Sequence, residues 1–501
     1  MKFRNPAIGK LYEYLSRKSR EAYGDSLLIS NVVLSKQHTR GRVLETYLTG
    51  EISSPVSFLF SVKKIIFYLV KNLIGLVLSV VIASLHRLSG QRFLIKEGED
   101  CVVLDTFFGV RHLLDKGEFK DIYFPRLSEY LTERKIEYVY IPKGLGFSNP
   151  LQLFRIFRIL KKTHVPVLTE FQVLKWVDYL DVLRFIFLYP FSIIRFADKL
   201  GTTYEDKVLY GGLWNALDGV AIESHIRYLF AKRLVAEKFG KIKCISWYEN
   251  LVTDKNFYRG LRTVPGKAEI TGAQLFLRPY TLMNLFADEQ EVPFDVVPDR
   301  ILVNGPGYSF DSSQVRVSVG PSLRYKHLFD GGLLSPARDN ILVVLPYWDH
   351  VVCDILEIVR QIDWPKPVKV KFHPAMNWRK YEWMILDKFS VTDESIEKLF
   401  PHALMVVGDS TGAIIEAASL GIPVINISKS GSFSHDYMPE IGKGIIWDQV
   451  EEVEEVSKLV TQFQKMLEEN PGQLKEEGTR LKSFCFSEPT DVLIGQAFEL
   501  G

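Results

Sequence analysis

The chain has 501 residues, of which 47% are hydrophobic and 24% charged, and this composition excludes a fibrous or disordered protein. At roughly 150 residues per domain, the length suits two large domains with an extension. The formal net charge of +2 is too even for a protein that neutralises nucleic-acid phosphates, so nucleic acid is not an expected partner.

Positive charge and apolar residues gather in the N-terminal region. Residues 1–100 carry 15 Lys and Arg against 8 Asp and Glu, and they contain an apolar run at 65–85 that a Lys-Asn pair interrupts. Its length allows a helix in the membrane surface, a spanning helix or a buried core helix. Segments 151–162 and 181–196 combine large apolar residues with Arg and Lys, which favours contact with an anionic inner leaflet.

The expected cellular compartment follows from the spacing of the cysteines and from the first twenty residues. Cys101, Cys244, Cys353 and Cys485 have no spacing typical of zinc sites or disulfide frameworks. The first twenty residues contain no apolar segment of a secretory signal. We therefore expect a cytoplasmic protein that is peripherally associated with the inner membrane.

From residue 101 onward, short β-branched runs alternate with segments long enough for helices, which predicts parallel α/β sheets. The predicted strands are 101–107, 137–142, 165–171 and 244–250, then 341–347, 368–374, 404–409, 422–427 and 445–448. Turn-rich sequence near residue 330 separates the two series. We expect an α/β fold of two doubly wound, Rossmann-like domains facing a cleft, with an N-terminal domain at 101–330 and a C-terminal domain at 331–501. A helical, apolar N-terminal region at 1–100 precedes them. Such sheets bind ligands at the carboxyl ends of their strands.

The most informative motif is GDSTGAIIEAASLG, a strand end followed by a turn and a helix. Backbone N–H groups and the hydroxyls of Ser410 and Thr411 suit an anion, and Gly412 lets a phosphate approach the backbone. Glu416 lies one turn deeper, where it can accept hydrogen bonds from a ribose diol. In the alternative interpretation, Ser410 only caps the helix and Glu416 is a surface residue.

A second motif, KFHPAMNW, ends another predicted strand with His373 and Pro374. Proline restricts the preceding residue to extended backbone, so His373 is predicted to face the cleft. A single histidine is more often structural than functional. Two groups of donors at the ends of strands in one sheet nevertheless predict a shared phosphate site.

At these residues the sequence resembles GT-B glycosyltransferases of bacterial surface-polysaccharide biosynthesis. The resemblance is nearest to the polysialyltransferase-like and Kdo-transferase-like enzymes, which use CMP-activated acidic sugars. It implies that His373 contacts the donor phosphate, that Ser410 and Thr411 bind this phosphate or the sugar carboxylate, and that Glu416 meets the ribose. It also implies that the domain at 101–330 is the acceptor-side domain and the domain at 331–501 the donor-side domain. The sequence has no D-x-D motif, so we expect a site without metal or cofactor, in which Lys429 adds positive charge.

Glycosyl transfer also needs a base for the acceptor hydroxyl. Asp105 and Glu249 both end predicted strands, and the surroundings of Glu249 resemble related surface-carbohydrate proteins more closely. Either carboxyl can instead be a helix cap or a buried hydrogen-bonding group, and a retaining enzyme would not use such a base. Gln274, Arg259 and Arg262 are candidates for the acceptor side, although both arginines also fit an ordinary helix face.

We therefore expect a glycosyltransferase that moves an acidic sugar, of Kdo or nonulosonic acid type, from a CMP-activated donor. The acceptor is expected to be a surface glycan or a lipid-linked molecule at the inner membrane surface. Three alternatives stay open: a CDP-glycerol or other nucleotide-sugar transferase, a sugar-nucleotide epimerase, and a non-catalytic glycan-assembly protein.

Overall fold

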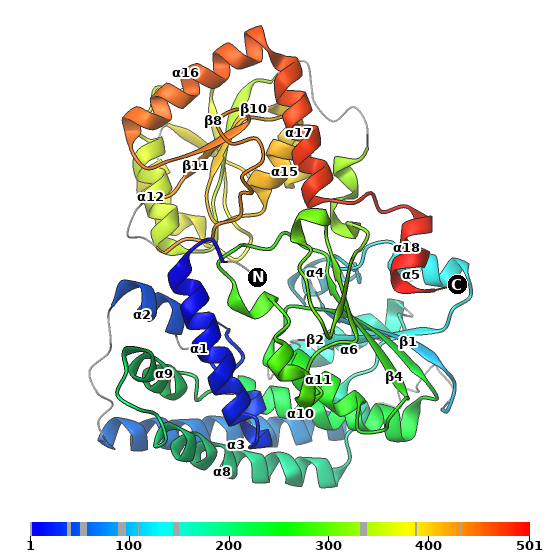
Figure 1. Ribbon diagram of the computed structural model, residues 1–501. Coiled ribbons are helices and arrows are strands. Elements are labelled where there is room, and N and C mark those ends of the chain that lie inside the picture. Colours follow the sequence, from blue (N-terminus) through cyan, green and yellow to red (C-terminus); the bar gives the residue numbers. More distant parts are fainter. Residues whose placement is uncertain are drawn as a thin grey trace.

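The chain folds into two α/β domains, with additional helices from its N-terminal region (Figure 1). A computed structural model describes residues 3–37, 42–50, 58–88, 97–108, 110–143, 150–163, 165–330, 338–385, 388–429 and 433–500. Each domain contains a wholly parallel sheet, six-stranded within this part of the chain. The predicted fold class, two Rossmann-like domains after an apolar helical extension, is confirmed.

The sheet of the N-terminal domain has the strand order β2-β1-β3-β4-β5-β6. Its strands are β1 (Cys101–Phe107), β2 (Tyr138–Lys143), β3 (Ile242–Trp247), β4 (Ala268–Gln274), β5 (Arg300–Val303) and β6 (Arg316–Val319). The first five are almost entirely buried, as strands covered by helices on both faces must be.

The prediction of a strand at 165–171 is wrong. Only Val167 pairs with the sheet, through a single bridge to Tyr140. Pro166 has no N–H to donate, and Thr169 already begins the short helix α7 (Glu170–Val173) with a capping box. Chain-breaking residues on both sides of Val167 therefore limit the pairing to one residue.

The sheet of the C-terminal domain has the order β12-β11-β10-β7-β8-β9. Its strands are β7 (Asn340–Val344), β8 (Val368–Lys371), β9 (Phe389–Val391), β10 (Ala403–Gly408), β11 (Val424–Ile427) and β12 (Trp447–Val450). Five of the six were predicted. The sixth, β9, has only three residues, too few for a recognisable pattern.

Helices cover both sheets and form the N-terminal extension. In the first half of the chain they are α1 (Pro6–Ala22), α2 (Val43–Thr49), α3 (Phe58–Leu88), α4 (Val110–Lys116), α5 (Leu127–Glu133), α6 (Pro150–Thr163), α8 (Trp176–Ala197), α9 (Tyr204–Asn215), α10 (Val220–Arg233) and α11 (Val252–Leu261). In the second half they are α12 (Asp349–Val359), α13 (Glu382–Ile385), α14 (Ile396–Leu399), α15 (Ala413–Ser419), α16 (Val453–Glu469), α17 (Pro471–Cys485) and α18 (Asp491–Phe498).

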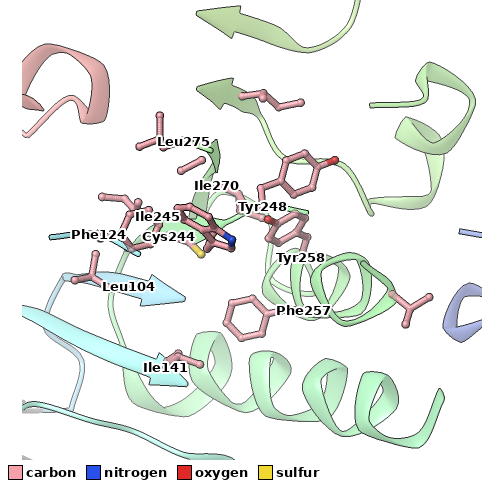
Figure 2. Close-up of a cluster of buried hydrophobic side chains, with 14 of the residues drawn as sticks. Leu104, Phe124, Ile141, Cys244, Ile245, Tyr248, Phe257, Tyr258, Ile270 and Leu275 are labelled. Carbon is pink, nitrogen blue, oxygen red and sulfur yellow. The ribbon is translucent and has the colours of Figure 1, made fainter. Parts of the chain in front are cut away.

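The core of the N-terminal domain lies between its sheet and the helices on the α10–α11 side. Figure 2 shows side chains from β1, β2, β3 and β4 meeting aromatic rings of α11. Leu104, Ile245, Phe257 and Tyr258 are fully buried there. These non-polar contacts fix the sheet on which the N-terminal half of the site is built.

The end of the chain returns from the second domain to the first. In Figure 1, α17 runs down from the C-terminal domain and α18 lies beside α5. Arg126 and Asp491 form an ion pair of 2.8 Å at this contact. The end of α17 can approach the chain after β5 this closely because residue 305 is glycine. A Cβ at Gly305 would lie 2.3 Å from the backbone of Cys485. The return of the chain therefore ties the two domains together.

Helix α3 contains the apolar run of the N-terminal region, and the Lys-Asn pair does not interrupt it. Asn72 is buried and donates its side-chain N–H to the backbone oxygen of Tyr68, one turn earlier. By length and composition, Phe60–His86 is able to cross a membrane, but 28% of its most apolar part is buried against the protein. The helix therefore packs on the domain along one side.

We expect Leu104→Ala to lower the free energy of unfolding of the N-terminal domain by about 2–5 kcal/mol, because it leaves a cavity in this core. Val492→Ala, at a side chain that is 69% exposed, should change it by about 0.5 kcal/mol or less. Urea denaturation followed by circular dichroism measures both. Equal denaturation midpoints for the two variants would contradict the described core.

Candidate active site between the two domains

A cavity of about 860 Å³ lies between the domains, where the carboxyl ends of strands from both sheets face each other. Residues after β1, β3 and β4 line it from one side, and residues after β7, β8 and β10 line it from the other. This is the location at which open parallel sheets bind ligands. The size suits a ligand as large as a nucleotide sugar.

The turn after β10 brings Ser410, Thr411 and Gly412 to the cavity, as predicted. Ser410 has a φ of 52°, in the left-handed region, and its Oγ accepts a hydrogen bond of 2.8 Å from the N–H of His435. Thr411 Oγ1 accepts a hydrogen bond of 3.4 Å from the N–H of Ala413. Thr411 therefore keeps its own hydroxyl hydrogen for a ligand, whereas the Ser410 hydroxyl also forms a hydrogen bond with the carboxyl of Asp409.

The two domains pack so closely at residue 412 that a side chain larger than that of glycine would not fit without a shift of its neighbours. A Cβ at this position would lie 2.9 Å from Leu277 of the N-terminal domain. Directly before the turn, burial raises the pKa of Asp409 to about 7. A carboxyl that is half protonated at neutral pH repels a bound phosphate less than an ionised one does.

His373 also lines the cavity, after β8. Partial desolvation lowers the pKa of His373 below its ordinary value, so the ring is neutral at physiological pH. Its Nδ1 accepts a hydrogen bond of 3.2 Å from the N–H of Ala375. The proton of the neutral ring is therefore on Nε2, which is left as the donor toward a ligand.

Glu416, on α15, lines the cavity and contacts the segment between the domains. Its Oε2 lies 3.1 Å from Nε2 of His327, in the 3₁₀ helix η6 (Leu323–Leu328). Burial acts to lower the pKa of His327, but the hydrogen bond and the charge of Glu416 together raise it above its ordinary value. The remaining lone pairs of the Glu416 carboxylate are available to a ligand hydroxyl.

Glu249 is the carboxyl that the N-terminal domain presents to the cavity after β3. Its Oε1 accepts a hydrogen bond of 2.9 Å from Trp247 Nε1, and its backbone oxygen accepts one of 2.7 Å from Asn284. Burial raises the pKa of Glu249 above its ordinary value, although the hydrogen bond from Trp247 opposes this shift. A partly buried carboxylate with a raised pKa has the properties of a general base.

The structure gives Asp105 a different environment. It is fully buried, pairs with Arg227 through Oδ1, and lies 3.1 Å from Lys143 Nζ and 2.8 Å from Ser246 Oγ through Oδ2. Burial acts to raise the pKa of Asp105, but the charges of Arg227 and Lys143 lower it below its ordinary value. Asp105 does not line the cavity described by these residues, and its partners make it a poor base.

The other predicted site residues do not line this cavity. Gln274 donates to the backbone of Leu285, Arg259 lies over the ring of Tyr228, and Arg262 pairs with Asp299 at 2.7 Å. Lys429 pairs with Glu357 at 3.0 Å and Asp354 at 3.3 Å. Pro374 follows His373 and is exposed. Among the lining residues of the described chain, none of these five is present.

Arg324 is a cavity residue that our sequence analysis did not select. Its guanidinium lies 5.5 Å from the ring centres of both Tyr123 and Trp247. Within the described lining it is the single Lys or Arg, alongside Glu223, Glu249 and Glu416. The sequence gives little signal for it, because η6 is a short irregular segment between two domains.

Groups of three or more His, Cys, Asp or Glu placed to hold a metal ion were not found among the residues that the structure describes. The polar groups that can meet a ligand here are therefore hydroxyls, backbone N–H groups, an imidazole, a guanidinium and carboxylates.

No family model matches the sequence, and no curated protein matches it. Solved structures with a similar arrangement include MurG of Acinetobacter baumannii, at 11% identity and a TM-score of 0.41, covering 80% of this chain and 99% of that one. They also include a putative UDP-N-acetylglucosamine 2-epimerase of Listeria monocytogenes, at 11% identity and a TM-score of 0.45, with 80% and 97% covered. The wall teichoic acid polymerase TagF has 12% identity and a TM-score of 0.39, with 89% and 97% covered.

Asp105→Asn is expected to destabilise the N-terminal domain by about 3–5 kcal/mol, because Arg227 and Lys143 lose a buried counter-charge. Asp393→Asn, at an exposed carboxyl, should change the stability by about 0.5 kcal/mol or less. Thermal and urea denaturation of the purified variants test this. An unchanged denaturation midpoint for Asp105→Asn would show that the network does not depend on this carboxylate.

Proposed function

We propose that the protein is a metal-independent glycosyltransferase of GT-B type, which moves an acidic sugar from a CMP-activated donor to a surface-glycan or lipid-linked acceptor. One observation carries the proposal. Glu249 of one domain faces His373 and the Ser410–Gly412 turn of the other domain across one cavity. A base and a set of anion donors on opposite walls are what transfer from a phosphate leaving group requires.

In the proposed reaction, the Glu249 carboxylate accepts the proton of the acceptor hydroxyl while the oxygen attacks the anomeric carbon. The bond from this carbon to the phosphate oxygen breaks, and CMP leaves with the electron pair. His373 Nε2–H and the Thr411 hydroxyl donate to the phosphate as its charge grows. Glu416 accepts a hydrogen bond from the ribose. This sequence of steps applies to an inverting enzyme.

The preference for an acidic sugar rests on two separate positions for an anion. One is formed by His373 and the β10 turn, and the other is Arg324, held against Tyr123 and Trp247. A CMP-activated acidic sugar carries two anionic groups, a phosphodiester and a carboxylate. A guanidinium is well suited to bind a carboxylate through two hydrogen bonds.

Nucleotide binding gives the first test. In a thermal-shift series without added metal, CMP should stabilise the protein more than CDP, UDP, GDP or ADP. A hundredfold excess over the dissociation constant corresponds to about 2.7 kcal/mol. His373→Ala should abolish most of this stabilisation, whereas His402→Ala, at an exposed histidine in a 3₁₀ turn before β10, should retain it.

A preference for CDP would instead favour CDP-linked donors such as CDP-glycerol. A preference for UDP would favour another transferase or an epimerase, which would release a product without an acceptor. Equal binding of CMP by the wild type and His373→Ala would contradict the phosphate site.

The pH dependence of transfer tests Glu249. A base must be deprotonated, so the rate should fall in acid, and the raised pKa of Glu249 places this fall above pH 4.5, the ordinary value for a glutamate. Glu249→Gln should lower kcat by about 10²-fold or more and remove the acidic limb from the residual rate. Preserved CMP stabilisation in this variant would show that the donor site is intact. Full activity of Glu249→Gln would contradict its role.

A further inference from the structure

Two helices of the N-terminal domain expose non-polar side chains along their whole length. On α3 these are Phe60, Ile66, Phe67, Val70, Ile74, Val77, Val81 and Leu85, between 40% and 65% exposed. On α8 they are Trp176, Val177, Leu180, Phe187, Leu188 and Phe191, between 39% and 66% exposed. We call these two stripes together the α3–α8 platform. Their spacing of three and four residues places each stripe on one side of its helix.

The two helices lie side by side along the edge of the molecule, at the bottom of Figure 1. Tyr68 of α3 and Tyr189 of α8 join them, with ring centres 6.1 Å apart. The exposed stripes therefore belong to neighbouring helices. An exposed non-polar surface of this extent marks an interaction site in a soluble domain.

The opposite side of α3 is packed against the protein in the middle of the helix and near its end. A Cβ at Gly219, directly before α10, would lie 3.3 Å from the Asn72 side-chain oxygen. Near the end of the helix, the ring of His86 lies 4.6 Å from that of Phe157 on α6. A helix that is held by α6, α8 and the start of α10 cannot also be surrounded by lipid, so α3 cannot cross a bilayer in this arrangement.

The charges beside the platform identify its partner. α3 and α6 contain no Asp or Glu, whereas Lys63, Lys71, Arg155, Arg158, Lys161 and Lys162 are exposed on them. α8 exposes Arg184 and Arg195, and Arg195 also lies 3.7 Å from Asp25. Its two acidic residues, Asp178 and Asp181, are paired with Arg233 and His225 of α10. Non-polar side chains next to exposed positive charge are the combination that binds anionic lipid surfaces.

We propose that the α3–α8 platform inserts into one leaflet of a bilayer containing anionic lipids, with α3 parallel to the membrane plane. The non-polar side chains enter about 5–10 Å, to the level between headgroups and acyl chains. The exposed Lys and Arg side chains contact lipid phosphates. This docking does not depend on the proposed glycosyl transfer.

The platform also has a structural relation to the cavity. Val220 and Glu223 of α10 line the cavity, and the residue before Val220 contacts α3. One helix therefore separates the proposed membrane contact from the candidate active site. Docking would hold this side of the cavity close to the lipid surface, where a lipid-linked acceptor is found.

Vesicle binding tests the proposal with the full chain. We expect the protein to sediment with phosphatidylcholine vesicles that contain 30% phosphatidylglycerol, and at least tenfold less with phosphatidylcholine alone or in 0.5 M salt. Val77→Asp and Phe187→Asp should each weaken binding to the anionic vesicles by about tenfold or more. Val492→Asp, at an exposed valine on α18, is the matched control and should bind like the wild type.

Native fluorescence provides a second readout that does not depend on a variant's affinity. Brominated lipids should quench Trp176 on α8 but not Trp383, which is equally exposed in the C-terminal domain. The quenched fraction should therefore disappear in Trp176→Phe and persist in Trp383→Phe. Persistence of the quenching in Trp176→Phe would overturn the proposal.

The orientation of α3 is tested by measuring how deep two of its residues lie in the bilayer. Val70→Cys and Leu85→Cys, labelled with a fluorescent dye in a Cys353→Ser background, lie about 22 Å apart along the helix axis. Both dyes should be quenched most strongly by bromine at the same shallow acyl position. Maxima at clearly different depths would mean that the helix spans the bilayer, and would overturn the proposal.

The remaining competitor is a second copy of the chain covering the platform. It predicts a dimer in lipid-free solution, which Val77→Asp converts to a monomer in sedimentation-velocity experiments, together with no binding to anionic vesicles. This result would overturn membrane docking while leaving CMP binding and transfer intact. Loss of CMP binding with preserved vesicle binding would instead contradict the proposed function alone.

Discussion

A buried network of charges joins the carboxyl ends of β1, β2 and β3 below the cavity. Lys143 Nζ lies 2.5 Å from Asp254 Oδ1 and 3.1 Å from Asp105 Oδ2, and Asp105 also pairs with Arg227. The second oxygen of Asp254 accepts the backbone N–H of Glu249 at 3.2 Å. Burying four charged groups is tolerated only when each one is paired, so the network has essentially one arrangement. It thereby fixes the backbone from which Glu249 reaches the cavity.

This network also explains why strand position alone did not distinguish the two candidate carboxyls. Both follow buried runs near strand ends: Asp105 lies within β1, two residues before its end, and Glu249 lies two residues after β3. What separates them is the presence of Arg227 and Lys143 beside Asp105, and these residues are far away in the chain. The location of the site at the strand ends could be predicted from sequence periodicity. The environment of each carboxyl could not, because it depends on tertiary contacts.

The same distinction between local sequence pattern and tertiary contacts applies to the strands and helices. Strands with long β-branched runs, such as β1 and β10, were predictable because burial on both faces demands such residues. The segment around Val167 has a similar composition, but Pro166 removes a donor and Thr169 starts a helix. The hydropathy of α3 likewise fits a membrane span, yet its buried polar contact at Asn72 is visible only in the folded chain.

The segment η6 relates the two halves of the candidate site to each other. Arg324 packs its charge against Trp247 of the N-terminal domain, and His327, three residues later, holds Glu416 of the C-terminal domain. A rotation of the domains that separated the β10 turn from Glu249 would have to break one of these contacts or bend η6. The close packing of Gly412 against Leu277 opposes the reverse movement, because the two domains already touch there. The distance between Glu249 and the β10 turn is therefore set at the domain junction, and a ligand that bridges Arg324 and the β10 turn would strengthen this arrangement of the two domains.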